Sequence, residues 1–524
     1  MIYQNPSSIR VLIDHMCREK VKNDTWHLRL KQITRFALIT QPEEEWEECF
    51  SCLAKYNWDG TRPIIHVRSV DELRKLLPIV TSGFFALNIA KSRNPSLELS
   101  SAIELGLLRR VSELYLVDSK LESHEINNLM SSPDISNLYR LKVYGYRPFE
   151  VGTIKSIADS RHLPNLKHLD LFGKHMGDQG VAHICRSSLA SNLESLNIGS
   201  NEISDQGMIY LAQTKWTNIK KLNLEYNPFT EVGLKNLAQN KHDSKLRSLL
   251  ISTNRNFGDG VLTHALQQGP FFTKIENLSL AQCELGAMDL KQIATGETFK
   301  NLARFTSSSN AFSESEFTAF ARTDRARSLN SIKTEYEAVN SNAVSALMSK
   351  VPSCNESLVK LSVKCCRVKN LCSKLSPNIT DLTLDSNKLG PDGVKSVACA
   401  IKDSSLESLS LVDVRMDANS VIVLLENLPK TLTKLNLNRN YIGDDLTAAL
   451  SQWDGLNQLE HLGLESSLLS DNALVELIES DKLHKLTSID LSGTQNFNAD
   501  TLNMVKEACR NLQRIIVPIE LAYG

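Results

Sequence analysis

The chain has 524 residues, and its 59 basic and 60 acidic side chains leave a formal net charge of −1. A balance this close to zero gives no electrostatic reason to expect a nucleic acid or an anionic membrane as the partner. No apolar run approaches the ~20 residues that a helix needs to span a bilayer, so we expect no membrane span.

The first 83 residues carry the least regular pattern. A degenerate strand is predicted around residues 33–38 and a second around 62–67, each followed by a helix-like stretch. We interpret residues 1–30 as a helical N-terminal cap and 31–83 as irregular repeats, because the end of a repeat array needs a polar cover. Trp26, Trp46 and Trp58 would then pack in that region. A separate small helical region is the alternative that the sequence leaves open.

From Phe84 onward, a motif of the form L-x-x-L-x-L recurs every 26 to 29 residues. A fixed period of this size indicates a solenoid, in which each repeat contacts its neighbours. About 17 copies place this solenoid at residues 84–524. Their first hydrophobic position is occupied in turn by Phe84, Val111, Leu138, Leu166, Leu193, Ile219, Leu246, Ile275, Leu302, Leu329, Leu358, Ile379, Leu406, Leu432, Leu459, Leu486 and Leu512.

The copy that begins at Leu193 shows how one repeat is built. Leu196 and Ile198 alternate with polar residues, as in a short strand with one buried side. Asn201 follows at the strand end, where a side-chain amide can bind the turning backbone. Gly207 precedes apolar residues at helical spacing. The pattern therefore predicts an α/β solenoid with a parallel sheet on its concave face and helices on its convex face.

These units resemble leucine-rich repeats of the long, ribonuclease-inhibitor type, in which L-x-x-L-x-L-x-x-N/C-x-L precedes a helix with G-[hydrophobic]-x-x-L-A. The segments GLKNLAQ (Gly233–Gln239) and GVKSVACAI (Gly393–Ile401) match the helical half. The resemblance covers about four-fifths of the chain and implies a horseshoe. Cys283 and Cys366 replace the asparagine, which the family tolerates. Further departures at that position are Ser119, Glu337, Val414, Ser467 and Thr494.

One step breaks the period, because Leu358 and Ile379 are separated by 379 − 358 = 21 residues. The short repeat at 358–378 should leave a thinner convex side. We therefore predict a local change of curvature there that splits the solenoid into two blocks.

The cysteines and the N-terminus favour a reducing compartment. The 11 cysteines, an odd number, are scattered over predicted strands and helices in the way that buried free thiols are. The N-terminus lacks the charged start and long apolar core of a secretory signal peptide. We expect a cytoplasmic protein, and delivery into a host cell stays open.

Motifs for catalysis and cofactor binding are not found. The sequence has no G-x-x-x-x-G-K-[ST] phosphate loop and no H-E-x-x-H. Cys49 and Cys52 form a C-x-x-C, but the glutamates before them would oppose thiolate formation. Four cysteines between residues 354 and 372 do not converge on one tetrahedral centre in the repeat register, and neither do the histidines between 162 and 183. We predict no catalytic residue, no cofactor and no metal site.

The register does predict a binding surface. In L-x-x-L-x-L-x-x-N, the residue between the last two leucines and the two after them face the concave side, where an aromatic group is not core. Adjacent parallel strands are ~4.8 Å apart, so four aromatic residues are expected to form one patch. These are Tyr115, Tyr144, Phe172 and Tyr226, with Tyr336 further along. The C-terminal half is predicted to be mildly acidic, with Asp385, Asp413, Glu465 and Asp490 offset by Arg439.

Each set has a plainer interpretation. The aromatic rings would stack on one another without any partner, and the charges would lie on a solvated face. Both alternatives stay open at the level of the sequence.

Exposed aromatic residues and the lack of catalytic motifs favour a non-enzymatic scaffold, adaptor or inhibitor that grips a protein partner in its concavity. A monomer is expected, and a bacterial effector is one form of this hypothesis. The alternative is a GTPase-activating regulator of a small GTPase, an activity of some relatives with this repeat type. The acidic tail that often accompanies that activity is missing. An enzyme fused to repeats would need a further domain, for which only residues 1–83 leave a span.

Overall fold

The computed structural model describes residues 64–66, 85–89, 94–116, 121–145, 147–242, 244–253, 257–261, 265, 269–349, 358–493, 499–509, 511–512 and 514–516. The predicted cap at residues 1–30, the three tryptophans, and Cys49 and Cys52 lie outside these ranges. One strand, β1 (Ile64–His66), falls within the segment 62–67 where a strand was predicted.

The chain divides into two compact units. Unit 1 comprises residues 1–256 and 264–275, and unit 2 comprises residues 257–263 and 276–524. The division falls at residues 257–275 and not at the short repeat, residues 358–378, where we predicted it, and the change of curvature expected there stays a prediction. Residues 365–380 contain no helix, but strand β12 (Lys360–Lys364) still pairs with both β11 (Ser331–Glu335) and β13 (Asp381–Thr383). The sheet of unit 2 therefore continues through the short repeat.

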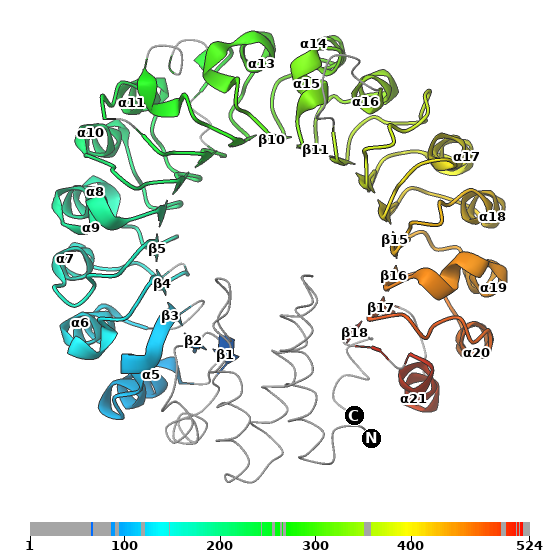
Figure 1. The fold of residues 1–524 in the computed structure, drawn as a ribbon, viewed down its shortest axis with the longest axis horizontal. Coiled ribbons are helices and arrows are strands. Elements are labelled where there is room, and N and C mark those ends of the chain that lie inside the picture. Colours follow the sequence, from blue (N-terminus) through cyan, green and yellow to red (C-terminus); the bar gives the residue numbers. More distant parts are fainter. Residues whose placement is uncertain are drawn as a thin grey trace. The chain divides into compact units, whose positions relative to one another are not determined.

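In unit 1, parallel strands pair with one another in chain order. After β1 they are β2 (Phe85–Asn88), β3 (Val111–Tyr115), β4 (Arg140–Lys142), β5 (His168–Asp170), β6 (Ser195–Asn197), β7 (Lys221–Asn223) and β8 (Ser248–Leu250). Helices cover one face of this sheet (Figure 1). They are α5 (Pro95–Glu104), α6 (Ser123–Ser131), α7 (Val151–Asp159), α8 (Gly177–Arg186), α9 (Leu189–Asn192), α10 (Asp205–Gln213) and α11 (Glu231–Ala238), with 3₁₀ turns η3 (Leu107–Arg110), η4 (Pro133–Ile135) and η5 (Pro270–Phe272).

Unit 2 repeats the arrangement, again with parallel pairing in chain order. Its other strands are β9 (Asn277–Ala281), β10 (Arg304–Ser308), β14 (Ser408–Ser410), β15 (Lys434–Asn436), β16 (His461–Gly463), β17 (Ser488–Asp490) and β18 (Arg514–Ile516). Its helices are α13 (Ala287–Thr295), α14 (Glu314–Ala321), α15 (Asp324–Ser328), α16 (Ser341–Met348), α17 (Gly390–Ile401), α18 (Ala418–Glu426), α19 (Asp444–Gln452), α20 (Asp471–Glu479) and α21 (Ala499–Ala508), with η6 (Glu297–Phe299) and η7 (Asp454–Gln458). In both units we call the helix-covered side the helix face and the other side the strand face.

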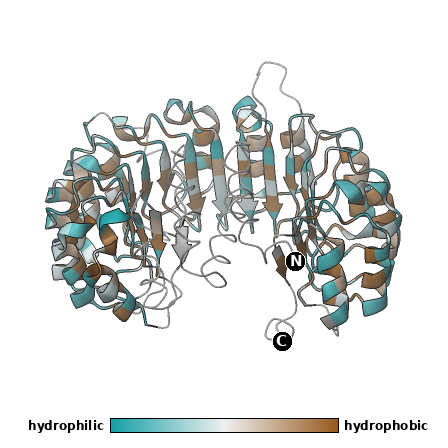
Figure 2. Ribbon diagram, turned by 60° about the horizontal axis from the view of Figure 1, so that its bottom comes forward, coloured by the Kyte–Doolittle hydropathy of each residue, from teal (hydrophilic) through white to brown (hydrophobic). Residues whose placement is uncertain are grey.

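The repeating apolar positions build the core between sheet and helices. Leu193, Leu196 and Ile198 are fully buried, and so are Met208 and Leu211 on the following helix. Apolar residues lie next to polar ones along the strands, as expected when one side of each strand is in the core (Figure 2). The predicted α/β solenoid with a parallel sheet and helices is thus confirmed.

Asparagines at the strand ends join successive repeats. The amide of Asn201 donates to the carbonyl of Leu171 at 2.9 Å and accepts from the backbone N–H of Lys174 at 2.9 Å. Asn227 does the same one repeat later, donating to Ile198 and accepting from the N–H of Asn201. These bonds satisfy turn groups that would otherwise be buried without partners, at a cost of about 1–3 kcal/mol each.

Within the described ranges, two charged residues occupy the asparagine position and are nevertheless buried. Glu337 accepts from the hydroxyl of Ser307 and from the backbone N–H of Asn310. Lys174, only 2% exposed, places its ammonium 4.6 Å from the centre of the Phe149 ring, a cation–π contact. The sequence analysis identified the departure at Glu337 and missed the one at Lys174.

Aspartates at helix starts form a second link between repeats. Asp205 accepts from the N–H and hydroxyl of Thr230, both at 2.7 Å, and from the N–H of Gly233 at 2.9 Å. A Cβ on Gly233 would lie 2.4 Å from an Asp205 oxygen, so the glycine of the helical motif makes room for this contact. Asp444 binds the N–H and hydroxyl of Ser470 in the same way.

Candidate protein-interaction surface

The strand register separates the predicted aromatic patch into different rows. Tyr115 aligns with Lys142, and Lys142 with Asp170. Tyr144 follows Lys142 by two residues, and Phe172 follows Asp170 by two. The row of these two rings continues to Gly199, because the N–H of Gly145 donates to the Phe172 carbonyl and the N–H of Gly173 donates to the Gly199 carbonyl. Tyr115 therefore lies in a different row from Tyr144 and Phe172.

Three of the four predicted rings are in contact. Tyr144 stacks on Phe172 with ring centres 4.9 Å apart and an interplanar angle of 21°. Phe172 meets Tyr226 edge-on, with centres 6.0 Å apart and an angle of 81°. We call Tyr144, Phe172 and Tyr226 the aromatic cluster.

A glycine allows Phe172 to reach Tyr226 across an intervening repeat. A Cβ on Gly199 would lie 2.8 Å from Cδ2 of the Phe172 ring, so the ring occupies the space that a side chain would fill. Phe172 is consequently only 8% exposed, whereas Tyr226 is 54% exposed. Our expectation that every ring of the patch lies outside the core is wrong for Phe172. Its neighbours on the strand face cover it.

Tyr115 is held by charged neighbours instead. Its hydroxyl donates to Glu113 at 2.5 Å, and Arg140 approaches the same carboxylate at 3.2 Å. Burial, followed by the hydrogen bond to Glu113, raises the pKa of Tyr115 above its usual range. The phenol therefore stays protonated at neutral pH.

The polar groups beside the cluster line a small concavity of about 240 Å³ on the strand face of β3 to β7. Lys142 lies 3.2 Å from Asp170 and its ammonium is 5.3 Å from the centre of the Tyr144 ring. Burial, with the charge of Arg140, lowers the pKa of His168 to about 4, so this imidazole is neutral at pH 7. Among the lining residues, Lys142 pairs with Asp170, and Arg140 pairs with Glu113 beside them, so two of the three basic side chains are neutralised.

Several predicted residues share one backbone position. Four of them stand directly before the asparagine position and adopt left-handed φ values. They are Tyr226 (58°), Tyr336 (53°), Asp413 (51°) and Arg439 (60°). The chain turns there from strand towards helix, and the left-handed conformation points the side chain away from the core. Neighbouring repeats place serine at this position, as at Ser200, Ser309, Ser386 and Ser466.

The large side chains at this position are exposed. Tyr336 is 63% exposed, and the thiol of Cys365 in the next repeat raises its pKa. The guanidinium of Arg439 forms two hydrogen bonds to one carboxylate oxygen of Glu465, at 3.0 and 2.7 Å.

The predicted acidic character of the C-terminal half is partly neutralised, because two of its four carboxylates pair with a basic side chain. Asp385 is only 8% exposed, because it accepts from the Ser410 hydroxyl at 2.6 Å and the Val412 N–H at 3.1 Å and pairs with Lys364 at 2.9 Å. Glu465 is paired with Arg439. Asp413 alone of the predicted acidic site residues remains exposed without an ion pair among the described residues. Asp385 thus supports the next repeat and is not part of an exposed rim.

Comparison with known proteins agrees with the fold. A family model described as leucine rich repeat matches residues 190–212, 375–398 and 429–445. These three segments of the chain are thus leucine-rich repeats. A comparison with curated protein sequences finds no match.

Two solved structures illustrate the likeness to known proteins, both at low sequence identity. An internalin from Listeria monocytogenes is 17% identical, with 75% of this chain and 93% of that chain covered and a TM-score of 0.37. The yeast complex of Rad7 and Elc1 gives 13% identity, 95% and 93% coverage, and a TM-score of 0.37. The assignment therefore rests on the matched segments and on the geometry of the leucine-rich repeats themselves.

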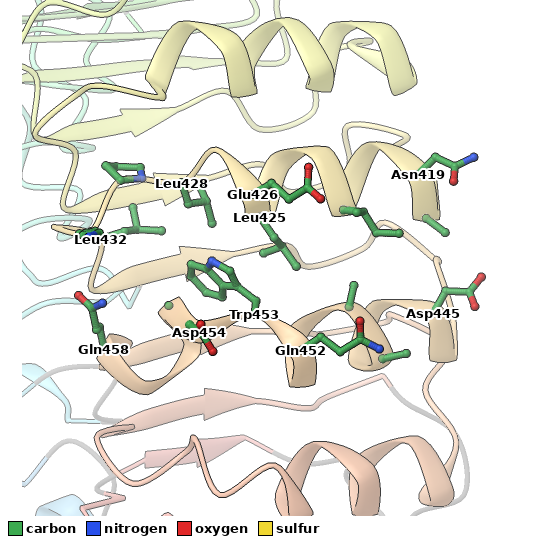
Figure 3. Close-up of a pocket in the computed structure, with 17 residues that line it drawn as sticks. Asn419, Leu425, Glu426, Leu428, Leu432, Asp445, Gln452, Trp453, Asp454 and Gln458 are labelled. Atoms are coloured by element: carbon green, nitrogen blue, oxygen red, sulfur yellow. The ribbon is translucent and has the colours of Figure 1, made fainter.

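The sequence analysis missed a groove on the helix face between two consecutive leucine-rich repeats. It lies between α18 and α19 and encloses about 760 Å³ (Figure 3). Consecutive alanines at Ala448 and Ala449 were the available signal, because small side chains on a helix leave space beside the neighbouring helix.

Within the described ranges, no group of three or more His, Cys, Asp or Glu side chains is arranged to hold a metal ion. Cys365 and Cys366 are half-buried and Cys372 is exposed. None of the helices in this part of the chain has the length and apolar character to cross a bilayer.

Proposed function

We propose that this leucine-rich repeat protein is a non-enzymatic scaffold that binds a protein partner through the strand face of unit 1, with Tyr226 as the main anchor. One observation carries the proposal. The Tyr226 ring is 54% exposed, yet its packing against a buried phenylalanine restricts its motion. Aromatic side chains of this kind dominate binding energy because they bury a large area at a small entropy cost.

Hydrogen bonds hold the backbone at Tyr226 in place. Its N–H donates to the Ser252 carbonyl at 2.9 Å, and the next residue, Asn227, is anchored to Leu224 and Ile198. A side chain that is already ordered in the free protein loses little conformational entropy on association. Affinity would then come from a small number of fixed groups.

The other predicted residues have different roles in this proposal. We propose further contacts on unit 2 at side chains that stand at the repeat position of Tyr226, or one residue before it. They are Tyr336, Asp413 and the Arg439–Glu465 pair. Tyr144, Phe172 and Asp385 support other groups. Tyr115 borders the concavity beside Lys142.

Photo-crosslinking tests the proposal. A benzoylphenylalanine placed at Tyr226 should capture a protein from a reducing cell lysate, and one placed at Val232 should not. Val232 is a matched control, because it is 59% exposed and lies in the same repeat, on helix α11 of the opposite face. The captured protein is then purified and its affinity measured against Tyr226→Ser, which copies the serine of neighbouring repeats.

Removal of a hot-spot tyrosine should weaken the binding free energy by at least about 2 kcal/mol, which raises the Kd roughly 30-fold. Equal capture at both positions, or an unchanged Kd for Tyr226→Ser, would contradict the proposal. Four further expectations stay predictions. They are regulation of a small GTPase, a role as an effector, a cytoplasmic location and a monomeric state.

A further inference from the structure

The helix-face groove of unit 2 has an apolar floor. Helix α18 contributes Ile422 and Leu425, and helix α19 contributes Ala448 and Ala449 opposite them. Trp453, just after α19, forms a wall near one end (Figure 3). Ile422 is 45% exposed, so the floor is open to solvent.

The groove exists because one repeat replaces larger side chains by alanine. Strands β15 and β16 align Lys434 with His461, and helices α19 and α20 begin at Asp444 and Asp471, so equivalent residues are 27 apart. Ala448 and Ala449 therefore correspond to Val475 and Glu476 of the next repeat. The indole of Trp453 borders the resulting space and packs against Gly455, where a Cβ would lie 2.1 Å from the ring.

Carboxylates dominate the rim. Glu426, Asp445 and Asp454 line the groove against a single basic residue, Lys430. The Asp454 carboxylate lies 3.1 Å from Lys482, but its side chain stays 99% exposed, and Glu426 and Asp445 are exposed as well. The rim therefore attracts positive charge and repels an anionic surface.

The shape favours a chain segment over a compact ligand. The groove runs along α18, from Asn419 and Asp445 at one end to Leu432 and Gln458 at the other (Figure 3). A helix of nine residues is about 13 Å long, which matches a short helical segment laid beside it. An amphipathic helix places apolar residues on one face and charged residues beside them, as such grooves require.

We propose that this groove is a second binding site, which takes a basic amphipathic segment of a partner protein. Apolar side chains of the segment fill the space between Ile422, Ala448 and Ala449. Its lysines or arginines meet Glu426 and Asp445. The site lies on the helix face of unit 2, whereas Tyr226 lies on the strand face of unit 1, so the site does not depend on the function proposed for unit 1.

A library of random 12-residue peptides displayed on phage tests this site. The full-length chain is the target, and the variant Ala449→Arg serves for counter-selection, because an arginine there fills the groove and adds a positive charge to it. We expect enriched peptides with a net positive charge and apolar residues at i, i+3, i+4 and i+7. A selection that yields no peptide specific to the wild-type groove, or yields acidic peptides, overturns the proposal.

Matched variants then locate the contact. Asp445→Lys should weaken the binding of a selected peptide at least about tenfold, by charge reversal at the rim. Asn472→Lys places a lysine at the equivalent exposed position of the next repeat, outside the groove, and should leave the affinity unchanged. Equal effects of the two variants would show a non-specific electrostatic attraction. Circular dichroism melting of each variant confirms that it folds.

Self-association is the competing occupant. If sedimentation shows a wild-type dimer that Ala449→Arg dissociates, while selected peptides fail to compete with it, the groove is an interface between copies of this chain. That result would also overturn the proposed site.

Discussion

The contact between Phe172 and Gly199 gives a quantitative test of how the aromatic cluster is built. A Cβ at Gly199 would lie 2.8 Å from Cδ2 and 2.9 Å from Cε2 of the Phe172 ring. Favourable carbon contacts begin near ~3.5 Å, so the ring has to move by roughly 0.7 Å or more. Overpacking of this kind costs about 1–3 kcal/mol, and we expect about 2 kcal/mol for Gly199→Ala.

The same substitution should be nearly neutral once the ring is gone. Phe172→Ala alone should cost about 3 kcal/mol, the lower end for a buried phenylalanine, because the strand face lets its neighbours relax. With Phe172 removed, the remaining close contact of the new Cβ is the Glu225 carbonyl at 3.1 Å. The double variant should therefore be about 2 kcal/mol more stable than the sum of the single changes predicts.

Urea unfolding followed by far-ultraviolet circular dichroism measures the four proteins of this cycle. Hydrogen exchange of the peptides around residues 172 and 226 is needed as well, since a repeat array can unfold in parts. Gly152→Ala on helix α7 is the control, because a Cβ there meets no atom within 4 Å. Additive effects within about 0.5 kcal/mol would refute the packing described for the cluster.

Three further outcomes follow from individual contacts. Burial raises the pKa of the Glu337 carboxyl, so folding favours the protonated form of this group. The stability that it contributes at low pH is therefore lost as the pH rises through the folded-state pKa. The change in urea midpoint between pH 5 and pH 7.5 should be smaller in Glu337→Gln than in the wild type, and identical changes would contradict this role. Asp205→Ala should cost about 1–2 kcal/mol and speed exchange of the Gly233 amide, because its backbone partners lose their acceptor, whereas Asp205→Asn should retain most of the stability. Tyr226→Ser should lower stability by less than about 1 kcal/mol, because the ring is more than half exposed; a larger loss in thermal melting would show that Tyr226 is structural.

The different burial of Phe172 and Tyr226 changes how a binding test has to be designed. A variant at Phe172 removes a supporting ring and destabilises the repeat, so a loss of binding would be ambiguous. A variant at Tyr226 removes an exposed ring and leaves the support in place. The two positions therefore separate a contact effect from a folding effect.

The sequence by itself determined the repeat, its period and its elements. Leucines at fixed spacing have one way to bury themselves together, which is to stack strands of successive repeats in parallel with helices on one side. The asparagine at the strand end and the glycine before the helical half were readable for the same reason. Each acts within its own repeat or on the next one, at the position that the period gives.

The tertiary structure alone decided which side chains of the strand face are exposed. Phe172 is buried because Gly199, 27 residues later, leaves a slot for its ring. Asp385 is buried because backbone and hydroxyl groups of the next repeat bind it. The groove beside α18 depends on small residues of a neighbouring helix. In each case the residue that decides the burial belongs to another repeat. A periodic sequence pattern shows which positions face each other, but it does not show whether the side chains at these positions have the sizes that let them pack.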